Sequence, residues 1–160
     1  MKIVHKALAC VVRTVGGRQQ LLIFDHLDGR FADPQDAVQI PKGTPEGSET
    51  IQAAAVRELK EESGVTMVRV LGTLPAREMK EWRGRRPPTG EVWWWHPVLM
   101  EPAAPIPDRW MQLADGNPSE VGLRFAFRWV DLDAAAGQLS VVFRPIVQAL
   151  IEAVRIDRGE

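Results

Sequence analysis

The sequence contains a single cysteine, Cys10, which lies in the apolar run ALACVV. One cysteine cannot form a disulfide within the chain, and its apolar neighbours predict a buried thiol with a structural role. No apolar stretch is long enough to cross a membrane as a helix. The apolar run near the N-terminus is interrupted and too short for a secretory signal. We therefore expect a cytoplasmic protein without a membrane partner.

The sequence also lacks an excess of charge of either sign. Lys and Arg total 20, Asp and Glu total 21, and the formal net charge is -1. This balance predicts no stable nucleic-acid partner. The sequence shows no internal repeat, low-complexity segment or interdomain linker. Its 160 residues are 45% hydrophobic and 26% charged, which predicts one compact globular domain over residues 1–160.

Strand-like and helix-like segments are mixed along the chain. Apolar, β-branched or alternating residues predict strands at 4–15, 20–26, 65–74, 91–100 and 123–130, with a short extended stretch at 37–40. Loops are expected at 41–47, 77–90 and 102–117, and Pro97 suggests a bulge or an edge position for its strand. A short helix is expected at 131–137, and a final helix begins near Pro145. This mixture predicts an α/β or α+β domain.

A further helix is predicted for residues 51–63, IQAAAVRELKEES. These residues include good helix formers, Thr50 can cap the N-terminus, and Gly64 can adopt the left-handed conformation that ends a helix. At about 100° per residue, Glu58, Glu61 and Glu62 share one face with the apolar residues of the first turns. The carboxylates therefore continue the side of the helix that packs inward.

Three clustered carboxylates raise one another's pKa and need a positive partner. Arg57, four residues before Glu61, is one candidate. A hard divalent cation is a better partner for several oxygens, because magnesium prefers carboxylates, waters and substrate phosphates. The competing interpretation of RELKEE is an ordinary solvated face of a charged helix.

The residues around this hexapeptide match a known signature. Residues 43–65 fit the pattern G-x5-E-x7-R-E-(apolar)-x-E-E-x-G-(apolar), and in this segment the sequence resembles the Nudix hydrolase family. The resemblance implies a Nudix-type α/β/α sandwich with a mixed central sheet. It also implies a pyrophosphohydrolase that cleaves a nucleoside diphosphate linked to another moiety, such as a dinucleoside polyphosphate. The alternative is a non-catalytic nucleotide-binding or sensing module of the same fold.

The resemblance also assigns roles to individual residues. The implied ligands of Mg²⁺ or Mn²⁺ are the carboxylates of Glu58, Glu61 and Glu62 and the backbone carbonyl of Lys42. Arg57 is expected to pair with Glu49 and to orient the acidic groups of the helix. Glu58 is the first choice for the base that activates water. Many relatives carry an acid shortly before the Trp of a late strand, whereas here the nearest preceding acid is Glu120, which is the alternative base.

Candidate substrate contacts lie at the edge of the signature and beyond it. Lys42 belongs to a PKG run similar to those of relatives that act on dinucleoside polyphosphates or inositol pyrophosphates, and it could meet a phosphate as a point charge. Arg83 and Arg85, in the basic segment 77–90, could close over a polyphosphate. A solvated loop is the competing interpretation for all three cations. At least one of the consecutive tryptophans 93–95 is expected in the core, because strand residues alternate between faces.

The intact signature favours catalysis over binding alone. We expect a nucleotide-derived small-molecule substrate. The sequence leaves the substrate and homodimer formation open.

Overall fold

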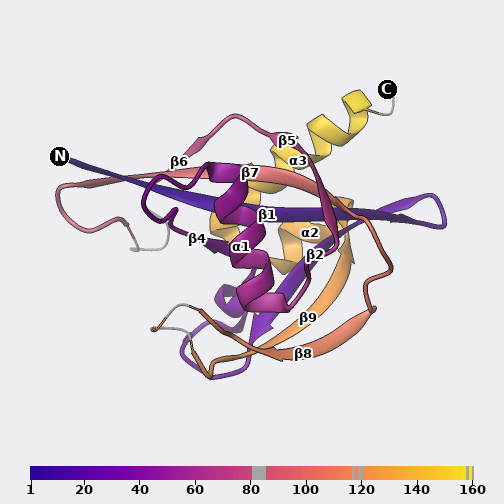
Figure 1. Cartoon of the computed structure of the whole chain (residues 1–160), viewed down its shortest axis with the longest axis horizontal. Helices are drawn as coiled ribbons and strands as arrows, with labels where there is room; N and C mark the ends of the chain where they lie inside the picture. The colour runs from indigo at the N-terminus through magenta and orange to yellow at the C-terminus, as the bar shows by residue number, and fades with distance from the viewer. Residues whose placement is uncertain (81–85, 117, 119–120, 158, 160) are drawn as a thin grey trace.

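The computed structural model describes residues 1–80, 86–116, 118, 121–157 and 159 (Figure 1). The strands are β1 (Lys2–Val15), β2 (Arg18–His26), β3 (Val38–Gln39), β4 (Lys42–Gly43), β5 (Val68–Thr73), β6 (Arg77–Met79), β7 (Glu91–Pro102), β8 (Arg109–Leu113) and β9 (Arg124–Asp131). The helices are α1 (Ile51–Ser63), α2 (Ala135–Gln138) and α3 (Arg144–Asp157), with short 3-10 helices η1 (Pro34–Ala37), η2 (Leu132–Ala134) and η3 (Val141–Phe143). None of the described helices has the length and apolar character that crossing a bilayer requires.

The central sheet is mixed, as the sequence predicts. Its main path runs β5-β7-β1-β2-β9-β8, and the short strands β3, β4 and β6 pair with β2, β1 and β7. Strand β1 runs parallel to β7 over its first part, where Lys2 to Val11 are paired. The end of β1 pairs antiparallel with β2, from Val12 to Val15. One long strand therefore joins the two halves of the sheet.

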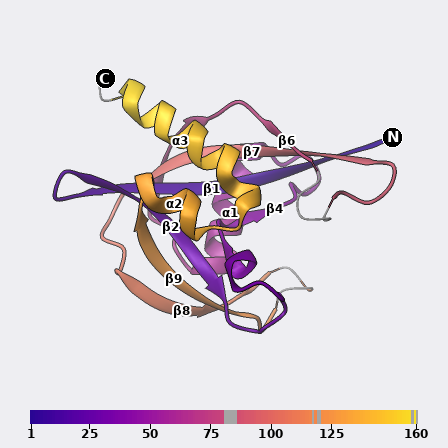
Figure 2. The same cartoon turned by 180° about the vertical axis from the view of Figure 1, so that it is seen from behind.

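Helices cover both faces of the sheet and form an α/β/α sandwich. Helix α1 lies on the face toward the viewer in Figure 1, and α2 and α3 lie on the face shown in Figure 2. Side chains of β1 alternate between the two resulting cores, with Ala7 and Ala9 toward α1 and Leu8 and Cys10 toward α3. The fold class predicted from the sequence is confirmed.

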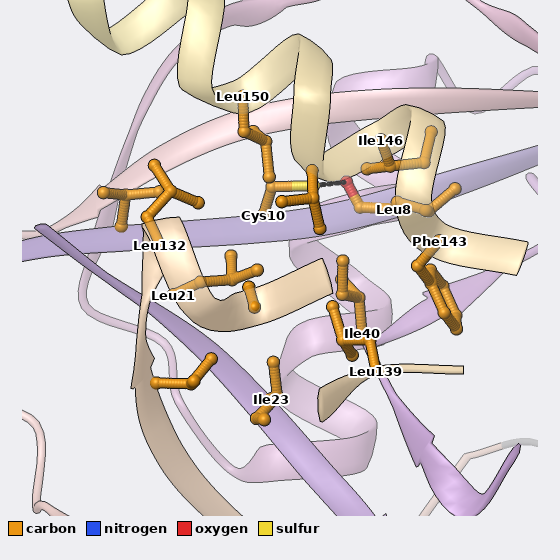
Figure 3. Close-up of a cluster of buried hydrophobic side chains, with 14 of the residues drawn as sticks. Leu8, Cys10, Leu21, Ile23, Ile40, Leu132, Leu139, Phe143, Ile146 and Leu150 are labelled. Carbon is orange, nitrogen blue, oxygen red and sulfur yellow. Dashed lines mark hydrogen bonds between the residues drawn. The ribbon is translucent and has the colours of Figure 1, made fainter. Parts of the chain in front are cut away.

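The core beneath α3 includes the single cysteine (Figure 3). The Cys10 thiol is buried among apolar side chains that include Leu150, and burial raises the pKa of this thiol to about 12. The thiol is therefore protonated at neutral pH and unreactive. Trp95 lies in the same core, which confirms that at least one ring of the tryptophan triple is buried.

Three segments expected to be loops contain short strands. Strand β4 lies in 41–47, β6 in 77–90 and β8 in 102–117. Each of these strands forms through pairing with a longer strand that is distant in sequence: β4 with β1, β6 with β7, and β8 with β9. Residues 81–85 lie outside the described part of the chain.

The expectation for Pro97 was wrong, because β7 is an interior strand between β5 and β1. The bulge lies instead on β5, between Val70 and Gly72. Pro97 stands where the neighbour of β7 changes, since Val98 pairs with β5 and Trp95 pairs with β6. The Pro97 carbonyl accepts a hydrogen bond from the Leu74 amide at 2.8 Å, directly after β5, and Pro97 is not among the residues that pair with β5 or β6.

Candidate active site

Helix α1 has the boundaries that the sequence predicts. The Thr50 hydroxyl accepts a hydrogen bond from the Ala53 amide at 3.1 Å and caps the N-terminus. Gly64 ends the helix with φ 79°, and its amide donates to the Lys60 carbonyl at 2.9 Å. The Trp110 indole on β8 donates to the Ser63 carbonyl at 2.9 Å. The helix is therefore held at both ends by local caps and at its C-terminus by β8 as well.

The acidic residues of α1 lie on its inward side. Glu58 and Glu62 are each 3% exposed, and the Glu61 side chain is 19% exposed. Lys60 is exposed on the other side of the helix. A solvated face would leave these carboxylates in water, so the structure contradicts that interpretation of RELKEE. Buried carboxylates need charged or hydrogen-bonding partners.

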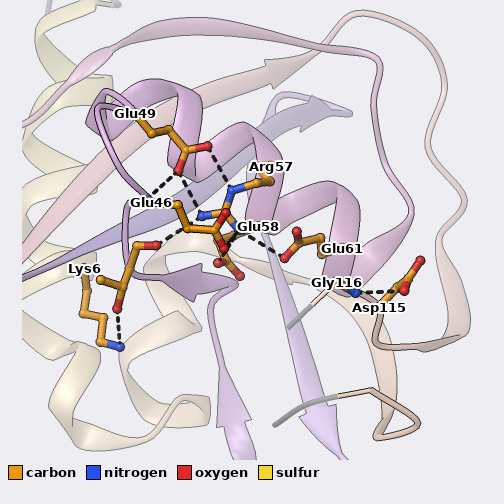
Figure 4. Close-up of polar contacts among 9 residues, drawn as sticks. Lys6, Glu46, Glu49, Arg57, Glu58, Glu61, Asp115 and Gly116 are labelled. Atoms are coloured by element: carbon orange, nitrogen blue, oxygen red, sulfur yellow. Dashed lines mark hydrogen bonds and ion pairs between the residues drawn. The ribbon is translucent and has the colours of Figure 1, made fainter. Parts of the chain in front are cut away.

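Arg57 is the partner that holds this cluster together (Figure 4). Its Nε and Nη2 donate to the two carboxylate oxygens of Glu49 at 2.9 and 3.0 Å, which is the expected pairing. Its Nη1 donates to Glu58 Oε1 at 2.9 Å and to Glu61 Oε2 at 3.2 Å. The hydrogen bonds from Arg57 lower the pKa of Glu49, and Glu49 is the main cause that raises the pKa of Arg57. The guanidinium therefore stays charged and fixes three carboxylates around it.

Strand β4 approaches Glu58 closely because Gly43 has no side chain. Gly43 pairs with Ala7 of β1, and a Cβ built on it would lie 2.0 Å from Glu58 Oε1. The backbone of β4, with Lys42 directly before Gly43, therefore lies against the buried carboxylate.

The loop between β8 and β9 approaches the same cluster from the other side. A Cβ at Gly116, where φ is +85°, would lie 2.3 Å from Glu61 Cδ. The Asp115 amide donates to the Glu61 carbonyl at 2.9 Å, and its side chain accepts from the Gly116 amide at 2.8 Å. The sequence does not identify these two residues, because it predicts a single loop over 102–117. The Asp-Gly pair was the available signal for a turn. Glu120, the alternative base, lies outside the described residues.

The Lys42 amine lies on the opposite side of β4 from the carboxylates. Its Nζ donates to Gln39 Oε1 at 3.3 Å and is 5.9 Å from the ring centroids of both Trp95 and Phe143. Neighbouring strand residues point to opposite faces, so Gly43 faces Glu58 while Lys42 faces the α3 side. Arg83 and Arg85, the other predicted substrate contacts, lie outside the described part of the chain.

A cavity of about 160 Å³ adjoins the Lys42 amine. Its lining comprises Asp36, Gln39, Lys42, Met79, Trp93, Trp95, Ser140, Val142 and Phe143. Trp95 is 4% exposed, and its indole Nε1 has no hydrogen-bond partner among the described residues. A buried donor without a partner at a cavity wall suits a ligand that brings an acceptor.

The donor set around α1 is suited to a hard divalent cation. Carboxylates and backbone carbonyls are the oxygen ligands that magnesium and manganese prefer. In the part of the chain that the structure describes, no three Asp, Glu, His or Cys side chains are already arranged to hold a metal ion. Arg57 Nη1 lies between Glu58 and Glu61 and supplies the positive charge there. A cation would share or replace this contact.

The fold is similar to that of known Nudix proteins. The RenU Nudix hydrolase from M. smegmatis has a TM-score of 0.66 at 20% identity, and the match covers 98% of this chain and 89% of that one. The C. elegans Ap4A hydrolase has a TM-score of 0.62 at 18% identity, with 96% and 98% covered. A mutT/nudix family protein from Listeria innocua has a TM-score of 0.57 at 15% identity, with 98% and 97% covered.

A comparison with curated proteins finds no match. The model of the NUDIX domain matches residues 4–150, which include the whole signature and nearly all of the sheet. Since this match spans most of the chain, the protein belongs to the Nudix hydrolase family.

Proposed function

We propose that this chain uses magnesium or manganese to hydrolyse the pyrophosphate bond of a nucleoside diphosphate linked to another moiety. Family membership supplies the reaction class, that of a pyrophosphohydrolase. The observation that carries the proposal is the buried acidic cluster. Glu58 and Glu62 lie inside the protein, Glu58 lies against the backbone of β4, and Arg57 holds Glu58 and Glu61. Burying such a cluster is costly, and a stability role alone does not account for it.

The proposed ligands of the metal are the carboxylates of Glu58, Glu61 and Glu62 and the carbonyl of Lys42. A metal held by these groups would neutralise the diphosphate and favour deprotonation of the attacking water. Arg57 acts as a positioning residue, because its hydrogen bonds fix the side chains of Glu49, Glu58 and Glu61. Glu58 is our first choice for the base. Asp115, whose backbone lies beside Glu61, is a further candidate for the base outside the signature, in addition to Glu120.

The cavity near Lys42 is the proposed site for the second moiety of the substrate. Its volume of about 160 Å³ suits one planar ring system rather than a whole nucleotide. Trp93 offers a ring face for stacking, and Trp95 offers its indole N–H as a donor. The base of a second nucleoside is planar and carries hydrogen-bond acceptors, so it could stack on Trp93 and accept from Trp95. A dinucleoside polyphosphate is therefore our preferred substrate class. The C. elegans Ap4A hydrolase, whose fold is similar, agrees with this preference.

We propose that the protein is an enzyme that acts on small molecules. We propose that residues 1–160 act as one catalytic unit in the cytoplasm, and that the partner is a nucleotide-derived compound. The competing function is a non-catalytic nucleotide-binding module. It would keep the fold and the cavity but would show no turnover.

The test is hydrolysis of a panel of nucleoside diphosphate derivatives with magnesium, followed by product analysis. The native chain is compared with Glu61→Gln and with Glu152→Gln, a control on the exposed side of α3. We expect Glu61→Gln to lose at least two orders of magnitude in kcat, and we expect the control to match the native rate. If the folded native chain cleaves nothing in a metal-dependent way, the binding module is the better function. A Glu61→Gln variant with native turnover would show that Glu61 has no catalytic role.

A further inference from the structure

We propose that Lys6 binds a phosphate of the substrate and connects the carboxylate cluster to the cavity at Trp93. The inference rests on the proposed function and deepens it, because it favours substrates with an extended phosphate chain between two moieties.

Lys6 lies in the first half of β1 and is half-buried. Its Nζ donates to Thr44 Oγ1 at 2.8 Å and lies 5.2 Å from the centroid of the Trp93 ring. A lysine side chain on a strand surface usually moves freely through many rotamers. Here the hydroxyl and the ring fix the ammonium in one place, so part of the entropy cost of binding an anion is already met in the fold.

Thr44 connects this ammonium to the acidic cluster. Its hydroxyl accepts from Lys6, while its backbone carbonyl accepts from Arg57 Nη2 at 3.1 Å. The same guanidinium donates to Glu58 and Glu61 through Nη1. A single residue therefore separates the Lys6 ammonium from the group that orients the proposed metal ligands.

The position on the sheet connects Lys6 to the cavity as well. Leu8 pairs with Lys42, and alternation along β1 places Lys6 on the same face as Leu8, the face toward α3. Trp93, over which the Lys6 ammonium lies, is part of the cavity lining. Lys6 therefore stands between the proposed reacting centre and the proposed ring site.

We expect a phosphate chain that joins these two places to pass beside the Lys6 ammonium. Lysine is suited to this contact because its compact charge binds phosphate oxygens without a fixed bidentate geometry. A sugar nucleotide or a simple nucleoside triphosphate could use the reacting centre alone. A substrate with a longer bridge would use both the metal and Lys6.

The first test measures binding without catalysis. Inorganic tripolyphosphate is titrated into the native chain, Lys6→Gln and Lys2→Gln by calorimetry, with folding checked by circular dichroism. Lys2 is a matched control on the same strand, because its side chain is 73% exposed and pairs with Glu91. We expect about a tenfold higher Kd for Lys6→Gln and an unchanged Kd for Lys2→Gln. Equal Kd values for the native chain and Lys6→Gln would overturn the proposal, whether or not the chain proves to be a hydrolase.

The second test separates a phosphate contact from a purely local role. With the substrate that the panel identifies, we expect Lys6→Gln to raise KM about tenfold, and we expect Lys6→Arg to restore most of the loss. Thr44→Val removes the hydroxyl but keeps the ammonium, so its effect on KM should be clearly smaller. If Thr44→Val reproduces the full loss and Lys6→Arg restores nothing, Lys6 only anchors Thr44 and the proposal fails.

Discussion

Gly43 lies so close to Glu58 that adding a side chain at this position tests the placement of the Glu58 carboxylate. A Cβ in Gly43→Ala would lie 2.0 Å from the Glu58 carboxyl group, so that carboxylate must move. The contact is with the end of a flexible side chain, and we therefore expect a folded variant with at least a tenfold lower kcat. The control is Gly72→Ala on β5, where a Cβ meets nothing within 4 Å. Native activity in Gly43→Ala would show that the position of Glu58 does not matter.

Arg57 should contribute to the stability of the folded chain. Replacing it by Met removes the ion pair between the guanidinium and the nearly buried Glu58. We expect the free energy of unfolding in the absence of metal to fall by about 2–4 kcal/mol, because breaking a buried ion pair costs more than the pair itself contributes.

Urea denaturation measures this loss, with Arg69→Met as the control. Arg69 pairs with Glu101 at the surface, and surface pairs contribute about 1 kcal/mol or less. Adding magnesium should recover part of the stability of Arg57→Met, since a bound cation stabilises the folded state. Equal losses in Arg57→Met and Arg69→Met would contradict the structural role of Arg57.

At the scale of elements, the end of α1 depends on a glycine. Gly64 has φ 79°, and a Cβ there would also lie 3.2 Å from Gln112 Oε1 on β8. Gly64→Ala should therefore lower the free energy of unfolding by about 1 kcal/mol. The midpoint of thermal unfolding should fall by about 2–4 °C. Gly137→Ala in α2, where a Cβ meets nothing within 4 Å, should show no such decrease.

Elements whose signals are local were predictable from the sequence. The boundaries of α1 follow from Thr50 and Gly64, and the inward side of the helix follows from the spacing of its glutamates. These signals lie within one helix, so no tertiary information was needed.

Elements that depend on distant partners were not predictable. Strand β8 is stable because Trp110 stacks on Phe127 with ring centroids 5.0 Å apart and donates to Ser63. The sequence of β8 contains no sign of these contacts. A sequence reading without β8 also misses Asp115 and Gly116, whose backbone lies against Glu61.

At the scale of the whole molecule, the free energy of unfolding should depend on pH in two windows that meet near pH 4. Burial is the main cause that lowers the pKa of His26 from 6.5 to about 4. Below pH 6.5 the unfolded chain binds a proton that the folded chain does not, so the free energy of unfolding decreases as the pH falls from 6.5 to about 4. Glu49 acts in a lower window, because its contribution is complete above pH 4.5 and is lost as the pH falls through its lowered pKa.

Urea denaturation across this range distinguishes the two groups. His26→Phe, which keeps ring contacts with Phe24 and Phe125, should flatten the dependence between pH 6.5 and 4. Some slope should remain because burial also lowers the pKa of His96. The decrease below pH 4, where only Glu49 is expected to contribute, should be unchanged in His26→Phe. A native slope throughout the upper window would show that His26 is not the responsible group.

The parallel pairing of β1 with β7 determines when the chain can fold. During synthesis β1 leaves the ribosome before β7, so Val11 cannot pair with Met100 until β7 has also been made. The hairpin of β1 and β2 can form at once, whereas the first half of β1 remains an unpaired edge with apolar side chains on both faces. Closing such a long loop is slow, and an open edge of this kind can join a second chain. Refolding from denaturant should therefore give the best yield at low protein concentration.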